Sequence, residues 1–116
     1  MTGPPIFLYG TLLDARTLAL RSGDARLALR GLPAVLLGHR RVRLRGTPYP
    51  TLRKDRAAAL AGELIRPSAA ALRRLAAYEG GVYRLHPVCV LTPRGPRKAR
   101  AWCAAAWRAG AAPWPT

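Results

Sequence analysis

The apolar positions at the start of the chain change from a continuous run to a helical spacing. The run at 6–9 follows two prolines and ends at Gly10, which is typical of a buried strand. From 12 to 20 the apolar residues recur at intervals of three or four, and Ser22 and Gly23 can end a helix. These positions predict a strand, a glycine turn and a helix.

The middle of the chain alternates between arginine and apolar residues. Residues 33–46 begin with an apolar run and continue with arginine alternating with valine and leucine. This pattern predicts a strand with one wet face and one dry face, broken near Gly38. The following residues predict a turn at 47–50, a loop at 53–56 and another strand at 60–65.

Residues 68–78 carry the strongest helical signal in the sequence. Ser68 is a natural N-cap, the interior is rich in alanine, leucine and arginine, and two glycines follow. Beyond this helix we expect strands at 82–92 and 98–107, joined by a hairpin-type connection at 93–96. The tail at 108–116 predicts no regular structure. The chain therefore reads as about five strands and two helices.

The length of 116 residues, half of them apolar, points to a single small domain spanning 1–116. Residues 1–7 lack the basic and apolar stretches of a signal peptide, and no apolar run approaches 18 residues. We therefore expect a cytoplasmic protein with no membrane partner.

The net charge of +15 first suggests a polyanionic partner, because twenty basic residues face only five acidic ones. However, 18 of the basic residues are arginine, and alanine, glycine and proline are also abundant. This mixture is typical of GC-rich coding bias at tolerant surface positions. Arg41, Arg43 and Arg45 form a basic stripe on one strand face, but no recognised motif combines it with aromatic residues. Nucleic-acid binding is thus the least favoured hypothesis.

The cysteines lack the spacing of metal ligands, so we expect no metal site from them. Cys89 and Cys103 are too few for a disulfide scaffold, and we expect two buried thiols unless neighbouring strands pair them. His39 adjoins two arginines and His86 precedes a proline in a strand, so both fit exposed or structural roles.

Glu79 differs from the other acidic residues because helical geometry places it on an apolar face. At 100° per residue it shares a narrow sector with Leu72, Leu75 and Ala76. It also lies at the helix C-terminus, where unpaired carbonyl groups disfavour a carboxylate. Burial and the helix dipole both raise a carboxyl pKa, which suits a general acid or base near neutral pH. The alternative is a buried glutamate paired with an arginine such as Arg84.

The turn at 9–12 is a second candidate site. Its glycine allows a ligand to approach the backbone, and the amides that follow suit a carboxylate, phosphate or oxyanion. The turn lacks the further glycines of a dinucleotide loop and the lysine of a P-loop. Taken alone, this turn is a weak signal.

Together the two candidates resemble the gamma-glutamylcyclotransferase-like family, of the gamma-glutamylamine cyclotransferase type. The similar motifs are Phe-Leu-Tyr-Gly-Thr-Leu at 7–12, Gly-Thr-Pro-Tyr-Pro at 46–50, Gly-Glu-Leu at 62–64, and Ala-Tyr-Glu-Gly followed by Tyr-Arg within 77–84. The resemblance covers about 6–107. It implies an α+β fold, a small mixed β-barrel of about five to seven strands with two flanking helices, in which Glu79 and the 9–12 turn meet at one cavity.

The resemblance also implies the roles of the site residues. Glu79 would deprotonate the α-amino group of a gamma-glutamyl substrate and later protonate the leaving amine. The substrate-binding residues would be the backbone amides of Gly10, Thr11 and Leu12 for the α-carboxylate or oxyanion, with Tyr9 and Tyr83 at the wall. Tyr49 would either line the mouth or serve as a turn residue that covers the barrel. The chemistry needs neither metal nor cofactor.

Three functions therefore remain open from the sequence. The leading one is an enzyme that cyclises a gamma-glutamyl amine or peptide to 5-oxoproline and releases the free amine, acting on a small molecule as a monomer or homodimer. The second is a catalytically silent module of the same fold that binds a small metabolite or a protein. The third is the basic nucleic-acid-binding protein considered above.

Overall fold

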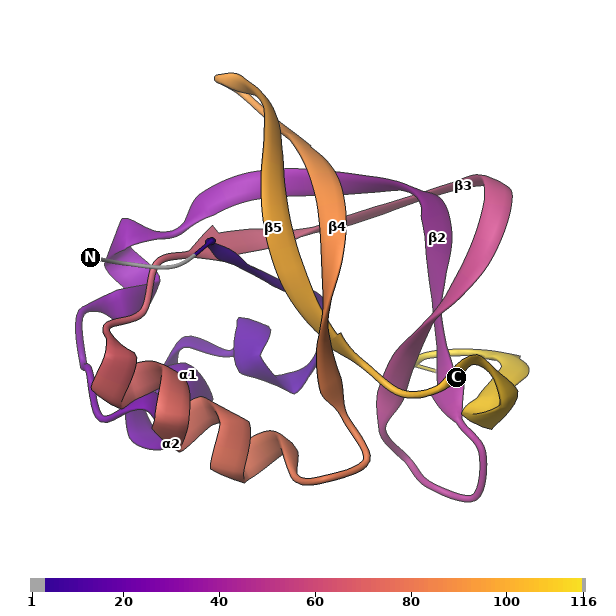
Figure 1. Ribbon diagram of the computed structural model, residues 1–116, viewed down its shortest axis with the longest axis horizontal. Helices are drawn as coiled ribbons and strands as arrows, with labels where there is room; N and C mark the ends of the chain where they lie inside the picture. The colour runs from indigo at the N-terminus through magenta and orange to yellow at the C-terminus, as the bar shows by residue number, and fades with distance from the viewer. Residues whose placement is uncertain (1–3, 116) are drawn as a thin grey trace.

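A computed structural model describes residues 4–115 and shows a closed, mixed five-stranded β-barrel with one additional strand and two α-helices (Figure 1). Around the barrel the strands follow the order β3-β1-β5-β4-β2, and β2 pairs with β3 to close it. Only β1 and β5 run parallel. The strands are β1 (Ile6–Leu8), β2 (Leu32–Leu44), β3 (Pro50–Ile65), β4 (Arg84–Thr92), β5 (Gly95–Cys103) and β6 (Ala109–Pro113). This architecture confirms the expected fold class.

The two α-helices, α1 (Ala15–Ser22) and α2 (Ala69–Glu79), lie together on one side of the barrel (Figure 1). The predicted helix at 12–20 is divided into a 3₁₀ turn, η1 (Thr11–Leu13), and α1. Asp14 separates them: its extended backbone ends η1, and its carboxylate accepts the Thr17 N–H at 2.9 Å as the N-cap of α1. The second predicted helix is confirmed, with Ser68 accepting the Ala71 N–H at 3.1 Å.

The short strand β1 is buried on both faces, which explains its uninterrupted apolar sequence. Phe7, with Tyr9 just beyond the strand, packs inside the barrel against a cluster that includes Leu36, Leu64 and Val90. Ile6 and Leu8 face the opposite way and join the cluster beneath the helices, which includes Leu18, Leu75 and Trp102. β1 therefore separates two cores, and the residues that follow it emerge where the two cores meet.

The predicted loop at 53–56 is wrong, because β3 continues through it as a strand. Pairing with β2 runs regularly up to Leu37 and resumes at His39, which lies opposite Lys54. Between these points the register shifts, and Gly38 of β2 has a φ of 75°. The break expected near Gly38 is thus a bulge in a long β2–β3 ribbon, since a bulge disturbs the pairing without ending the strand.

The tail predicted to be irregular, 108–116, instead contains β6, which pairs with β2 up to Pro113. Arginine side chains from β2, from β3 and from the turn after β2 fix this segment by donating to its carbonyl groups. The distances are 3.1 Å from Arg40 to Ala111, 3.3 Å from Arg45 to Ala109, and 3.0 Å from Arg53 to Gly110. Thr116 lies outside the described residues. A segment of alanine, glycine and proline carries no periodic signal, so long-range partners decide its structure.

The prediction for the two cysteines is only partly correct. Cys89 is exposed and Cys103 partly buried, and both thiols are free, so the expectation of two buried thiols is wrong for Cys89. Two further short 3₁₀ helices, η2 (Leu27–Arg30) and η3 (Ala106–Arg108), connect the main elements. Within residues 4–115, no helix is long and apolar enough to span a membrane.

Candidate active site

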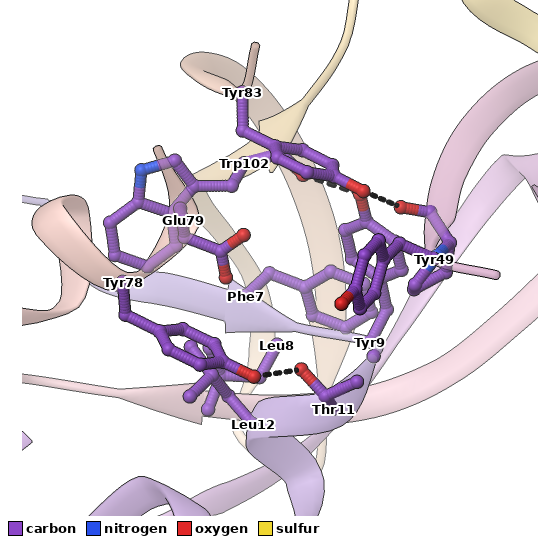
Figure 2. A pocket seen from close by; sticks show the side chains of 12 residues that line it. Phe7, Leu8, Tyr9, Thr11, Leu12, Tyr49, Tyr78, Glu79, Tyr83 and Trp102 are labelled. Atoms are coloured by element: carbon purple, nitrogen blue, oxygen red, sulfur yellow. Dashed lines mark hydrogen bonds between the residues drawn. The ribbon is translucent and has the colours of Figure 1, made fainter. Parts of the chain in front are cut away.

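A cavity of about 230 Å³ opens where β1 leaves the barrel, between η1, the end of α2 and the start of β3 (Figure 2). All seven residues that the sequence singles out line it: Tyr9, Gly10, Thr11, Leu12, Tyr49, Glu79 and Tyr83. Phe7, Leu8, Pro50, Tyr78 and Trp102 complete the lining. Residues from the beginning, middle and end of the chain therefore meet at one pocket.

Glu79 is the last residue of α2, and its carboxylate points into the middle of the pocket, as Figure 2 shows. The apolar stripe predicted for α2 is present at Leu75, which is buried, and at Leu72, which is partly buried, whereas Ala76 is exposed. Because Glu79 lies on the same face of α2, its carboxylate also points inward. The local pattern of the helix thus accounts for the direction of the acidic side chain.

Burial raises the pKa of Glu79 from 4.5 to about 7. Among the described residues the ion pairs are Asp24 with Arg30 and Asp55 with Arg40, so Glu79 has no cationic partner. The predicted alternative, a pair with Arg84, is wrong: Arg84 begins β4 and is exposed. The carboxyl is therefore poised between its acid and base forms at neutral pH.

The turn after β1 approaches β3 so closely that only glycine fits at position 10. A Cβ atom on Gly10 would lie 2.8 Å from Cγ of Pro50. The backbone then enters η1, in which the Leu13 N–H donates to the Gly10 carbonyl at 3.0 Å. Thr11 and the hydroxyl of Tyr78 share a hydrogen bond of 3.0 Å, which links this turn to α2 beside Glu79 (Figure 2).

The tyrosines of the wall are held by backbone acceptors. The buried Tyr9 hydroxyl donates to the Trp102 carbonyl, and the Tyr83 hydroxyl donates to the Pro50 carbonyl at 2.7 Å. Burial raises the pKa of Tyr9 well above 10 and the pKa of Tyr83 to about 12. Both rings therefore stay protonated at neutral pH. Tyr49 is 54% exposed and also lines the pocket.

Sequence reasoning missed the contributions of Tyr78, Pro50 and Trp102. Tyr78 adjoins Glu79 in the same motif, and this adjacency was the available signal for its place at the site. Trp102 reaches the pocket through the pairing of β5 with β1, and Pro50 begins β3, where it pairs with Arg43 of β2. No local pattern encodes these pairings. Residues 4–115 contain no cluster of three His, Cys, Asp or Glu side chains that could hold a metal ion.

A family model described as "Gamma-glutamyl cyclotransferase, AIG2-like" matches residues 6–113. The chain belongs to this family. Membership confirms the resemblance seen in the sequence and supports a cyclotransferase-type function in general terms. No curated protein matches the sequence significantly.

Several solved structures share this fold. Two solution structures of Arabidopsis thaliana proteins share 21% and 25% identity with the chain, with TM-scores of 0.73 and 0.72, and the alignments cover 87% and 90% of it. A structure described as gamma-glutamyl cyclotransferase shares 18% identity over 87% of the chain, with a TM-score of 0.72. The alignments cover 68%, 65% and 66% of these proteins, so the chain spans about two thirds of their length.

Proposed function

We propose that this protein cyclises a gamma-glutamyl amine or peptide to 5-oxoproline and releases the free amine. The observation that carries the proposal is the carboxyl of Glu79, which projects into the pocket, has no cationic partner within residues 4–115, and has its pKa raised by burial to about 7. It faces a turn whose sequence is also typical of the family. A carboxyl kept in this state suits repeated proton transfer better than ion pairing.

In the proposed reaction, the uncharged α-amino nitrogen of the gamma-glutamyl group attacks its own γ-carbonyl carbon. A new C–N bond closes the five-membered lactam ring, and the nitrogen gives a proton to the ionised carboxylate of Glu79. The protonated carboxyl then passes this proton to the leaving nitrogen as the original amide bond breaks. The products are 5-oxoproline and the amine, and no water or redox partner is consumed.

The turn opposite Glu79 supplies donors for the other end of the substrate. The first N–H groups of a helical turn have no partner within the turn, so the amides of Gly10, Thr11 and Leu12 suit the α-carboxylate or the oxyanion. Tyr9, Tyr83 and Tyr49 form walls that shield the reacting atoms. The pocket volume of about 230 Å³ lies below the range of about 300–1,000 Å³ typical of drug-sized ligands, which favours a small glutamyl group.

The test is to incubate the purified protein with a panel of gamma-glutamyl amines and gamma-glutamyl amino acids. We expect 5-oxoproline and the free amine in equal amounts from at least one compound. Glu79→Gln should lower the rate at least about 100-fold, because general acid–base catalysis typically contributes that much. Glu63→Gln is the matched control, since Glu63 lies on β3 and does not line the pocket.

Each outcome of this test selects one function. Product formation at an unchanged rate by Glu79→Gln would refute the role of Glu79. If no compound is turned over but 5-oxoproline stabilises the protein against heat, the fold serves as a metabolite-binding module instead. The charge hypothesis is tested separately by salt-dependent binding to nucleic acid, which we do not expect at physiological salt.

A further inference from the structure

Arg41 of β2 connects the pocket turn to the C-terminal segment. Its Nη1 donates to the Tyr9 carbonyl at 2.7 Å, and its Nε donates to the Trp114 carbonyl at 2.9 Å. The guanidinium also lies over the indole ring of Trp114, 5.1 Å from its centroid. The side chain is partly buried, whereas Arg43 of the same strand and Arg45 in the turn that follows are exposed.

Trp114 in turn is fixed from two directions. Its backbone N–H donates to the Arg41 carbonyl at 3.2 Å, and its indole Nε1 donates to the Pro48 carbonyl at 2.7 Å. Pro48 precedes Tyr49 and Pro50, which line the pocket. The residue just after β6 therefore holds both Arg41 and the turn that forms the mouth of the pocket.

The contact to Tyr9 controls the peptide group that follows it. In a trans peptide the C=O and the N–H point in opposite directions, so anchoring the Tyr9 carbonyl also fixes the direction of the Gly10 N–H. Glycine restricts its own backbone less than any other residue, so position 10 needs an outside anchor. A hydrogen bond from a charged guanidinium is also stronger than one between neutral groups, and it polarises the amide to which it binds.

We propose that Arg41 is a positioning residue that sets the direction of the Gly10 N–H in the pocket, and that Trp114 holds Arg41 in place. The proposal rests on the function proposed above and assigns this amide to the α-carboxylate, a group that both the gamma-glutamyl substrate and 5-oxoproline carry. Arg41 itself touches no substrate, since it does not line the cavity. Arginine suits this role because its planar group donates in two directions while stacking on an aromatic ring.

The test compares Arg41→Gln and Arg41→Lys with a matched control, Arg53→Gln. Arg53 also donates to a carbonyl of β6, that of Gly110, but it does not contact the pocket turn. We expect KM for the gamma-glutamyl substrate, and the inhibition constant of 5-oxoproline, to rise about tenfold in Arg41→Gln, the size of effect that the loss of one charge-assisted hydrogen bond produces. Arg41→Lys should show a smaller rise, and Arg53→Gln none.

If Arg41 only stabilised the fold, its substitution would change the amount of active enzyme and not KM. Partial unfolding lowers the amount of active enzyme, and so the apparent kcat, while KM stays the same. An unchanged KM and inhibition constant in Arg41→Gln would therefore overturn the proposal, whatever happens to the melting temperature. If Arg41→Gln does not fold, Arg41→Lys decides by the same two constants.

Trp114→Leu supplies an independent measurement. Because Trp114 is proposed to act through Arg41, its replacement should raise KM in the parent protein and have little further effect in Arg41→Gln. Additive effects of the two substitutions would contradict this coupling. If the parent protein turns over no gamma-glutamyl compound, the proposed function fails; if it does turn over and KM is insensitive to Arg41, only the present inference fails.

Discussion

Replacing Glu79 with glutamine should stabilise the protein at neutral pH while it removes the reactive group. The ionised carboxylate is unfavourable where it lies, because burial raises its pKa from 4.5 to about 7 and none of the described cations pairs with it. Glutamine has nearly the same shape and carries no charge at any pH. The substitution therefore removes the cost of ionisation and leaves the packing of α2 almost unchanged.

The magnitude follows from the two pKa values. A group whose pKa is raised by folding binds more protons in the folded state, so its favourable contribution is complete below the unfolded pKa and is lost as pH rises through the folded pKa. For Glu79 this interval runs from 4.5 to about 7. At about 1.4 kcal/mol for each pKa unit, the loss amounts to at most about 3.5 kcal/mol. In a chain of this size that corresponds to a shift in Tm on the order of 10 °C.

The assay is chemical denaturation of the parent protein and of Glu79→Gln at several pH values between 4 and 8.5. The free energies of unfolding should be similar near pH 4, and the variant should become more stable as pH rises, with the difference levelling off above pH 8. Glu63→Gln, which alters a glutamate outside the pocket, serves as the control for general effects of the substitution. A difference that does not depend on pH would refute the reasoning that Glu79 is a buried carboxyl of raised pKa.

Three further predictions concern the surroundings of the site. Gly10→Ala should lower kcat/KM at least tenfold, because its Cβ would lie 2.8 Å from Cγ of Pro50; steady-state kinetics measure this. Tyr78→Phe removes the 3.0 Å hydrogen bond to Thr11 and should raise KM severalfold, as measured by the same assay, with little change in Tm. Asp14→Ala should destabilise the protein at neutral pH and less so in acid, because its hydrogen bonds from Thr17 lower the pKa of Asp14; thermal melts across pH measure this, and the opposite trend would contradict it.

The parts of the structure that the sequence could predict are those that local patterns specify. The spacing of Leu72 and Leu75 places Glu79 on the inner face of α2, and Gly10 marks the turn after a buried run. Each of these signals lies within a few residues of the group that it positions. The alternation of arginine with Val42 and Leu44 likewise predicts their burial correctly, since strand geometry alone decides it.

Features that depend on contacts between distant segments could not be predicted in the same way. The strand β6 pairs with β2, and its carbonyl groups accept from arginines of β2, of β3 and of the turn after β2. Nothing in the sequence of 109–113 indicates these contacts. With a register shift beside Gly38, β3 continues as a strand through 53–56, where the polar residues suggested a loop. The cation opposite Glu79 that the arginine-rich composition led us to consider is absent from the described residues, because Arg84 points to solvent.

Some of the abundant arginines also have a structural role, which the interpretation as a surface background did not include. Arg40, Arg41, Arg45 and Arg53 each donate to a backbone carbonyl of the C-terminal segment. Such contacts satisfy acceptors that a short edge strand leaves unpaired. Several of the arginines therefore attach β6 and Trp114 to the barrel, and Arg41 also links this segment to the pocket turn.

The pH dependence of 5-oxoproline formation tests the central claim most directly, because it reports the proton transfer assigned to Glu79. The ionised carboxylate must accept the first proton, so kcat/KM of the parent protein should fall below an apparent pKa of about 7. Glu79→Gln should show at most a small residual rate without this inflection. An inflection near 4.5, or the same inflection in the variant, would contradict the account.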